Sequence, residues 1–263
     1  MKLGADGKVT VGWLHMSSTL KDKVALVTGA GSGIGRAICQ RLAQEECLIV
    51  LVGRERSKLD ETVARLPKTA KTLICDADIS NNSQVVRIVG SVQHHFSRLD
   101  LLVNAAGVNV TQRSLADCSV EDFEKVIAID LTGAFLITKA FIPMMREQKH
   151  ATVINIGSDA GWRGNSYAGV AYISAKFGLR GLTEAINAEE RHNGIRATSI
   201  YPGEVDTPIL DKRPKPPSAE QRAVMLQPED VAECVALAAL MPPRAIVEDL
   251  VIRPAVRHWG TFS

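Results

Sequence analysis

Val24-Ala-Leu-Val-Thr28-Gly-Ala-Gly-Ser-Gly-Ile-Gly35 joins an apolar run to a glycine-rich turn, and a helical pattern follows to about Glu45. The run 24–27 is apolar throughout, which is typical of a strand buried on both faces of a sheet. A strand that leads through glycines into a helix N-terminus makes a phosphate site, because backbone amides and the helix dipole attract the anion. The spacing is T-G-x-x-x-G-x-G, since Ile34 stands where G-x-G-x-x-G needs a glycine. The alternative is a flexible turn that binds nothing.

Further short apolar runs alternate with helical patterns along the rest of the chain. Strands are expected over 48–52, 72–75, 101–103, 152–156, 196–200 and 247–252, and helices over 83–96, 120–145, from 171 onward and over 228–240. Residues 209–227 are rich in proline and lysine and are expected to form a loop or mobile lid. This alternation predicts an α/β fold with a doubly wound parallel sheet, in a three-layer αβα arrangement.

The composition indicates an ordinary soluble globular protein and excludes several classes. Hydrophobic residues make up 46% and charged residues 23%, and the net charge of +2 gives no footprint for nucleic acid or a membrane surface. The histidines form no cluster with metal-ligand spacing, so no metal site is expected. Five scattered cysteines without a C-x-x-C motif favour reduced thiols and a cytoplasmic protein.

The chain is expected to consist of an N-terminal extension and one domain. Residues 1–19 show no period and are interpreted as an N-terminal extension, and residues 20–263 as a single domain that binds a dinucleotide and carries the catalytic residues. The first twenty residues lack the apolar core of a signal peptide, and the apolar run 234–241 is far too short to cross a membrane. We therefore expect no membrane-spanning segment.

Tyr172 and Lys176 lie four residues apart in a helical pattern whose apolar positions include Ala175, Leu179 and Ile186. On a helix this spacing places both side chains on one face. A phenol is a poor acid or base at neutral pH, but a neighbouring ammonium stabilises the phenolate. The pair is a candidate acid–base catalyst. Taken alone, the motif favours a helix-face aromatic beside a solvated lysine, because such pairs often arise by chance.

The end of the second strand indicates the nucleotide. An acid at this point binds the adenosine ribose of NAD, whereas a nearby base accepts the 2′-phosphate of NADP. Here the strand ends in Gly53-Arg54 with no acid at its tip, and Glu55 lies one residue beyond the position where an acid would bind the ribose. The sequence favours NADP(H) over NAD(H), unless Arg54 is only a surface charge.

Together these motifs resemble the short-chain dehydrogenase/reductase family, over about residues 20–254. The matching pieces are T-G-x-x-x-G-x-G at 28–35, Asp78, N-A-A-G at 104–107, Ser158, Y-x-x-x-K at 172–176, and Pro-Gly followed by Thr207. Each is weak alone, but six in order at workable spacing are specific. The resemblance implies a Rossmann-type fold, NAD(P) binding and redox chemistry between carbonyl and alcohol groups.

The resemblance also implies roles for individual residues. Tyr172 would be the acid–base catalyst, Ser158 would hold the substrate oxygen, and Lys176 would bind the nicotinamide ribose and tune Tyr172. Asp78 would contact adenine. The residues expected to bind the cofactor are Gly29, Ser32, Gly33, Ile34, Gly35, Arg54, Asp78, Ile79, Asn104, Ala105, Gly107, Tyr172, Lys176, Pro202, Gly203, Val205 and Thr207.

One position departs from the family. Its fourth catalytic residue is an asparagine in the long helix, where this chain has Ile129-Asp130-Leu131. An ionised aspartate cannot donate a hydrogen bond, and its charge would raise the lysine pKa if Lys176 were close. The family's proton relay uses a water near the backbone carbonyl, which both residue types have. We therefore count Asp130 as catalytic and expect Asp130→Asn to keep or raise turnover; a role of its own would lower it.

The loop after Ser158 suggests a substrate site. Trp162 and Arg163 would form an apolar wall and a carboxylate clamp, unless Arg163 faces solvent or pairs with Asp159. The sequence thus predicts an oxidoreductase that passes hydride between NADP(H) and a 3-oxoacyl thioester, a small keto or hydroxy acid, or a ketone. The alternative is a cofactor-binding regulator or scaffold with little catalysis, which Asp130 alone supports.

The predicted partners are a small-molecule substrate and further copies of the chain. The predicted helix 120–145 and the helix that carries Tyr172 have apolar residues on more of their surface than the single stripe needed to pack against the sheet. In the resembled family these helices commonly build the core of a homotetramer. We expect a homotetramer, with a dimer as the alternative.

Overall fold

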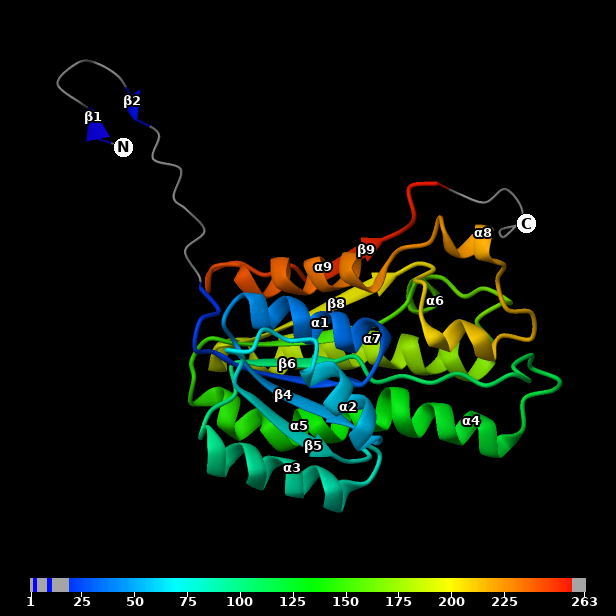
Figure 1. Ribbon diagram of the computed structural model, residues 1–263, viewed down its shortest axis with the longest axis horizontal. Helices are drawn as coiled ribbons and strands as arrows, with labels where there is room; N and C mark the ends of the chain where they lie inside the picture. Colours follow the sequence, from blue (N-terminus) through cyan, green and yellow to red (C-terminus); the bar gives the residue numbers. More distant parts are fainter. Residues whose placement is uncertain (1, 4–8, 11–18, 257–263) are drawn as a thin grey trace.

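The computed structural model describes residues 2–3, 9–10 and 19–256 (Figure 1). Most of the predicted N-terminal extension therefore lies outside the described residues. Within it, β1 (Lys2–Leu3) and β2 (Val9–Thr10) pair as an antiparallel two-stranded sheet that is separate from the main sheet.

The main sheet has seven parallel strands in the order β5-β4-β3-β6-β7-β8-β9. The chain runs outward from β3 to β5, then returns to the other side of β3 and continues to β9. This reversal is the topological switch point beside which parallel sheets bind ligands, at the carboxyl ends of the strands. The strands are β3 (Val24–Thr28), β4 (Leu48–Gly53), β5 (Thr72–Asp76), β6 (Leu101–Asn104), β7 (Ala151–Ile156), β8 (Ile195–Pro202) and β9 (Asp249–Ile252).

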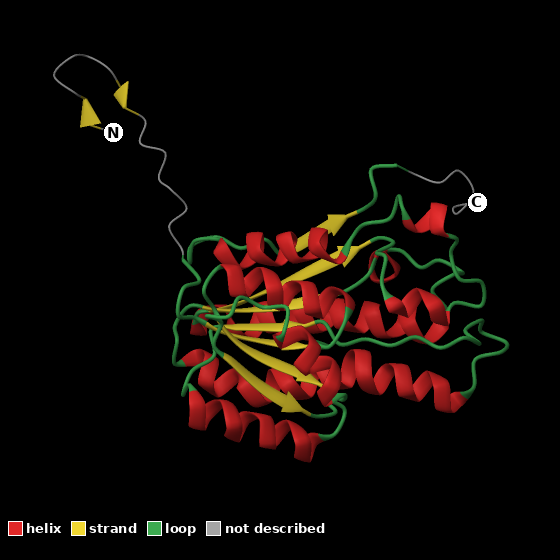
Figure 2. Cartoon of the chain, viewed as in Figure 1, coloured by secondary structure: helices red, strands yellow, loops and turns green. Residues whose placement is uncertain are grey.

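Helices cover both faces of this sheet, so the three-layer α/β fold is confirmed (Figure 2). One core lies between the sheet and α1 with α9, and the other between the sheet and α3, α5 and α7. The helices are α1 (Gly33–Gln44), α2 (Arg56–Val63), α3 (Asn82–His95), α4 (Val120–Ile127), α5 (Gly133–Arg146), α6 (Asp159–Trp162), α7 (Val170–Glu190), α8 (Ala219–Arg222) and α9 (Pro228–Leu240).

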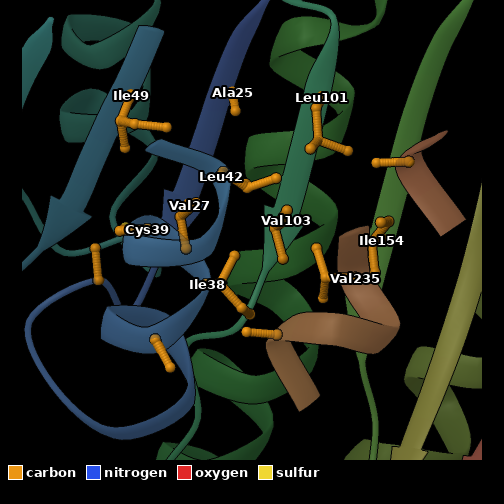
Figure 3. Close-up of a cluster of buried hydrophobic side chains, with 14 of the residues drawn as sticks. Ala25, Val27, Ile38, Cys39, Leu42, Ile49, Leu101, Val103, Ile154 and Val235 are labelled. Atoms are coloured by element: carbon orange, nitrogen blue, oxygen red, sulfur yellow. The ribbon is translucent and has the colours of Figure 1, made fainter. Parts of the chain in front are cut away.

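The apolar strands fold this way because successive side chains point to opposite faces. In β3, Ala25 and Val27 enter one core while Val24 and Leu26 enter the other. Figure 3 shows the first core, where Ile38 and Leu42 of α1 lie beside the sheet. All five residues of β3 are buried, which explains why the run 24–27 shows no polar alternation.

The long helix expected over 120–145 is interrupted. A π-helical turn, η1 (Ala128–Thr132), separates α4 from α5, and Asp130 lies within it. By length and composition alone Val120–Arg146, which contains an 18-residue window with a mean hydropathy of 1.7, is long and apolar enough to cross a membrane. This candidate span differs from the expectation that no segment could cross a membrane. In the fold the segment packs as a core helix, since Ile137 and Phe141 are fully buried against the sheet.

The structure differs from the predicted elements at three further places. The last strand begins at Asp249 rather than at 247, and α2 had not been predicted. The segment 209–227 holds most of the 3₁₀ turn η3 (Pro208–Lys212), as well as α8. A second 3₁₀ turn, η2 (Arg191–Asn193), follows α7.

Candidate active site

The glycine-rich turn after β3 is held against the segment that follows β6. The Thr28 hydroxyl oxygen accepts hydrogen bonds from the Ala105 and Ala106 amides, each at 3.1 Å. Gly29 has a φ of +67°, and a Cβ there would lie 2.8 Å from the Ala106 Cα. A Cβ on Gly35 would lie 2.2 Å from the Gly29 carbonyl oxygen. Only glycine fits either position, so the turn keeps its backbone open to a ligand.

This turn leads into an uncapped helix. Ser32 is the N-cap of α1, and its side chain makes no capping hydrogen bond. The first turn of α1 holds no acidic residue. The first amides of α1 and the positive end of its dipole are therefore free to bind an anion such as a diphosphate.

A cavity of about 260 Å³ runs from this turn to α7 across the carboxyl ends of the strands. Its residues come from the glycine turn, the ends of β4 and β5, the segment after β6, and the first half of α7. Among the residues predicted to bind the cofactor, it is lined by Gly29, Ser32, Gly33, Ile34, Gly35, Arg54, Asp78, Ile79, Ala105, Gly107, Tyr172, Lys176 and Thr207.

Tyr172 and Lys176 share one face of α7, as their spacing predicts. The Lys176 ammonium lies 5.3 Å from the centroid of the Tyr172 ring. Lys176 is 4% exposed, and its Nζ also donates to the Ile156 carbonyl at 3.2 Å. Because Ile156 ends β7, the lysine is fixed between the helix and the sheet.

Asp130 lies against the same lysine. Its Oδ2 is 3.3 Å from Lys176 Nζ, and its Oδ1 accepts from the Val108 amide at 2.7 Å. Asp130 is fully buried, and within the described part of the chain Oδ2 has no other polar partner. A Cβ on Gly107 would lie 3.0 Å from that oxygen, so glycine leaves the pair open to the cavity at this point.

The charges of this pair affect each other. Burial lowers the pKa of Lys176, but the negative charge of Asp130 and that of a Tyr172 phenolate raise it above its ordinary value. Burial raises the pKa of Asp130, against the opposing effects of Lys176 and the Val108 amide. We assign Lys176 as an ammonium, because both a carboxylate and a carbonyl oxygen face it. The pKa shift of Lys176 that the sequence predicted for a close Asp130 is confirmed.

The other end of the cavity is cationic. Arg54 and Lys58 both line it, and the Glu55 carboxylate accepts from Lys58 Nζ at 2.8 Å. The one acid near the tip of β4 is thus already paired. Arg54 is exposed and makes no ion pair or hydrogen bond within the described part of the chain, so its guanidinium is available to an anion at this end.

Known proteins resemble this chain in sequence and in fold. A family model described as short chain dehydrogenase matches residues 23–217. The chain belongs to the short-chain dehydrogenase family. An uncharacterized oxidoreductase of Staphylococcus epidermidis is 32% identical over 235 residues, which cover 89% of this chain and 98% of that protein. The family and its relatives make the protein an oxidoreductase, and the predicted resemblance is confirmed.

Solved structures of the family superpose closely. Levodione reductase has a TM-score of 0.82 at 30% identity and covers 89% of this chain and 97% of its own. The closed form of serine dehydrogenase, complexed with NADP+, has a TM-score of 0.81 at 27% identity over 91% and 98%. A 3-ketoacyl-(acyl-carrier-protein) reductase from Brucella melitensis, complexed with NADH, has a TM-score of 0.80 at 26% identity over 90% and 98%.

Four residues predicted to bind the cofactor do not line the cavity. The Asn104 amide is buried and donates to Thr138 Oγ1 at 3.1 Å and Asn155 Oδ1 at 2.8 Å, so it braces the interior. Pro202 and Gly203 pair with the last strand, because the Gly203 amide donates to the Ile252 carbonyl at 2.8 Å. Val205 is buried and bridges to Leu226.

The substrate residues predicted after β7 also differ. Ser158 caps the four-residue α6, because its hydroxyl oxygen accepts from the Ala160 amide at 3.2 Å. Trp162 packs 5.2 Å from the Tyr201 ring, under the Arg180 guanidinium at 4.7 Å. Asp159 pairs with Arg253, and the exposed Arg163 has no side-chain partner in the described ranges. The wall and clamp formed by Trp162 and Arg163 stay predictions.

Other cavity-lining residues were not predicted. They are Gly31, Val52, Gly53, Glu55, Lys58, Leu59, Ala77, Ala106, Val108, Ile129, Ile156, Gly157, Pro208 and Ile209. Most of these residues are apolar or glycine and lie next to a predicted site residue. The only sequence signal that could have identified them is their position near the end of a strand. Lys58 could have been found as a second cation one helical turn after Arg54.

A larger cavity, of about 880 Å³, lies at the opposite, amino-terminal ends of the strands. It contains none of the predicted site residues. We assign the chemistry to the smaller cavity, because Tyr172, Lys176 and the open end of α1 meet there. The described residues contain no group of three metal-binding side chains.

Proposed function

We propose that this oxidoreductase uses NADP(H) to interconvert a carbonyl and a secondary alcohol. The proposal is carried by one observation: the glycine turn, Arg54 and the Tyr172–Lys176 pair line a single continuous cavity. A dinucleotide has its phosphates and its reactive ring at a distance from each other. A cavity with an anion site in its middle and an acid–base pair at one end matches that layout.

The residues present fit such a cofactor. The unused amides of α1 face the diphosphate position, and Gly29 and Gly35 leave the backbone bare beside it. The nicotinamide ring, when bound, supplies or accepts the hydride. Tyr172 gives or takes the proton of the substrate oxygen, and the Ser158 hydroxyl, whose proton remains free to donate, helps to hold that oxygen. Lys176 keeps a positive charge beside the phenol.

The preference for NADP(H) rests on charge. A 2′-phosphate needs a cation, and the adenosine end of the cavity offers Arg54, while Lys58 neutralises Glu55. Neighbouring structures carry both nucleotides, since serine dehydrogenase holds NADP+ and the Brucella reductase holds NADH. The local charges therefore support the choice more strongly than the neighbours do.

We also propose that the protein is a cytoplasmic homotetramer, with a dimer as the alternative. All five cysteines are free thiols, three of them buried, which suits a reducing compartment.

The proposed function is tested by following the absorbance of NADPH with a panel of ketones, keto acids and 3-oxoacyl thioesters. We expect consumption with at least one class, and a fall of about 10²-fold or more in Tyr172→Phe, because the phenol supplies the proton. Fluorescence titration should show that Tyr172→Phe still binds NADPH. Tight NADPH binding without turnover of any carbonyl would instead identify a regulator or scaffold.

A further inference from the structure

We propose that Arg113 recognises a carboxylate on the substrate, so that the enzyme acts on small oxo acids or the corresponding hydroxy acids. This inference rests on the proposed function and names its substrate class. It assigns the clamp to an arginine that the sequence analysis did not single out.

Arg113 lies where three segments of the catalytic edge meet. It belongs to the connection from β6 to α4, and its Nη1 donates to the Tyr167 carbonyl at 3.3 Å. Its Nη2 donates to the Lys212 carbonyl at 2.8 Å, at the end of η3. Its own carbonyl accepts from the Val170 amide at 3.0 Å. Arg113 is thus fixed to the start of the helix that carries Tyr172.

The cavity reaches this region from the other side. Thr207, Pro208 and Ile209, at and just before the start of η3, line it, and so does Tyr172. Tyr172 also packs in a small apolar cluster with Val110, three residues before Arg113. Arg113 is not among the residues that line the cavity, but its guanidinium is bonded to the two segments, at Tyr167 and Lys212, that flank this part of it.

The edge of this guanidinium formed by Nε and Nη2 is the edge that other arginines of this chain use for carboxylates. Three other arginines hold both oxygens of a carboxylate with Nε and Nη2, which form one edge of the planar group. These pairs are Arg98 with Asp100, Arg146 with Glu190 and Arg253 with Asp159. In Arg113 the Nε on the same edge is buried and has no hydrogen-bond partner among the residues that the structure describes.

The positive charge of Arg113 also has no counterion. The side chain is 7% exposed, and no carboxylate contacts it among the described residues. Burial lowers the pKa of Arg113, and the nearby Arg213 lowers it further, against a smaller opposite effect of Tyr172. A buried guanidinium bonded only to carbonyl oxygens is costly, and an anionic ligand would relieve that cost.

Arg196 shows what a purely structural, half-buried arginine looks like in this chain. All its nitrogens are used: Nε donates to Thr152 Oγ1, Nη1 to two carbonyls, and Nη2 to three. Two of these carbonyls, those of Ala238 and Ala239, belong to the last turn of α9, whose dipole is negative at that end. Among the described residues, Arg113 has no acceptor for its Nε, and the two carbonyls that its side chain bonds do not belong to an α-helix.

The proposal requires the β6–α4 connection and η3 to part when a substrate reaches Tyr172, because the Arg113–Lys212 hydrogen bond joins them. Parting these two segments breaks the Arg113–Lys212 bond and frees Nη2 beside the already free Nε. The two donors then match the two oxygens of a carboxylate.

The test compares acids with their methyl esters as substrates for NADPH consumption: pyruvate, acetoacetate and levulinate against methyl pyruvate, methyl acetoacetate and methyl levulinate. In the unmodified enzyme we expect kcat/KM for the best acid to exceed that for its ester by about tenfold or more, because only the acid gains an ionic contact. Equal or better turnover of the esters would overturn the inference and leave the proposed function standing. Turnover of neither series, nor of any other carbonyl, would defeat both.

Variants then locate the effect. In Arg113→Gln the ratio of kcat/KM for acid to ester should fall about tenfold or more, mainly through KM for the acid. Arg113→Lys should give a partial fall, because it keeps the charge but loses the two-donor edge. Arg65→Gln, at an exposed arginine that does not line the cavity, is the matched control and should leave the ratio as it is. An equal loss on acid and ester in both Arg113 variants, with NADPH binding retained, would mean that Arg113 only braces the loops.

Discussion

At Asp130 a single side chain changes the electrostatics of the catalytic centre. The family has an asparagine here, whereas this chain places a buried carboxylate 3.3 Å from Lys176. An uncompensated buried charge is strongly unfavourable, so each partner depends on the other. The Lys176 ammonium is therefore shared between Asp130 and the Ile156 carbonyl before any cofactor enters.

This contact changes our expectation for Asp130→Asn. From the sequence we expected turnover to be kept or raised; the buried pair favours the other outcome. The new amide would turn either a donor or a poorer acceptor toward the ammonium, and Lys176 would lose its counterion. We now expect turnover with NADPH to fall by about tenfold or more, equivalent to roughly 1.4 kcal/mol of barrier. Unchanged or higher turnover would show that only the backbone carbonyl at this position matters.

The same variant has a signature in its pH profile. Asp130 contributes to raising the pKa of Lys176, and burial alone lowers it. Without the carboxylate, the pKa of Lys176 should drop, so the ammonium is lost at lower pH. We expect the alkaline limb of kcat/KM against pH to move toward neutral pH in Asp130→Asn. A limb that stays in place would exclude Lys176 as the group that titrates there.

Among the elements, the connection from β4 to α2 sets the choice of nucleotide. Replacing Gly53 by Asp and Arg54 by Leu removes a cation and adds a carboxylate at the ribose position. We expect the double variant to prefer NADH, and Arg54→Leu alone to raise KM for NADPH about tenfold or more, from the lost charge-assisted hydrogen bond. Steady-state kinetics with both nucleotides measures this. Preference for NADH by the unmodified protein would refute the assignment.

The structure adds a control to that experiment. A Cβ on Gly53 would lie 3.1 Å from Leu59 Cδ2, and Leu59 is fully buried. Gly53→Ala introduces the same crowding without a charge. Any loss of stability shared by Gly53→Ala and the double variant therefore comes from packing, and thermal unfolding of both separates it from the change in nucleotide preference.

In the whole molecule, exposed aromatic residues mark the helices expected to meet in an oligomer. Phe135 of α5 and Phe177 of α7 are each 43% exposed. We expect light scattering to show a homotetramer at micromolar concentration, and Phe135→Glu with Phe177→Glu to give smaller species, because buried charges oppose association. Val86→Glu on α3, where Val86 is 62% exposed, is the control and should keep the assembly. A monomeric wild type would contradict the proposal.

Local patterns identified most of the fold. The seven strands were found because buried parallel strands are short runs of apolar residues, and their predicted ends agree with the structure within about two residues. The interruption of the long helix at Ala128–Thr132 was not found. A π turn shifts the helical register by only one residue, so the apolar stripe continues across it and the pattern still reads as one helix.

The sequence by itself determined the parts whose chemistry depends on neighbours along the chain. The glycine turn, the cation at Arg54 and the face shared by Tyr172 and Lys176 each follow from spacing within one or two elements. Only the tertiary structure decided which distant groups meet. Asp130 reaches Lys176, Asn104 turns inward, and Arg113 joins the segments at Tyr167 and Lys212 because packing of the helices and loops brings them together. Burial and counterions arise from that packing, and no local pattern records them.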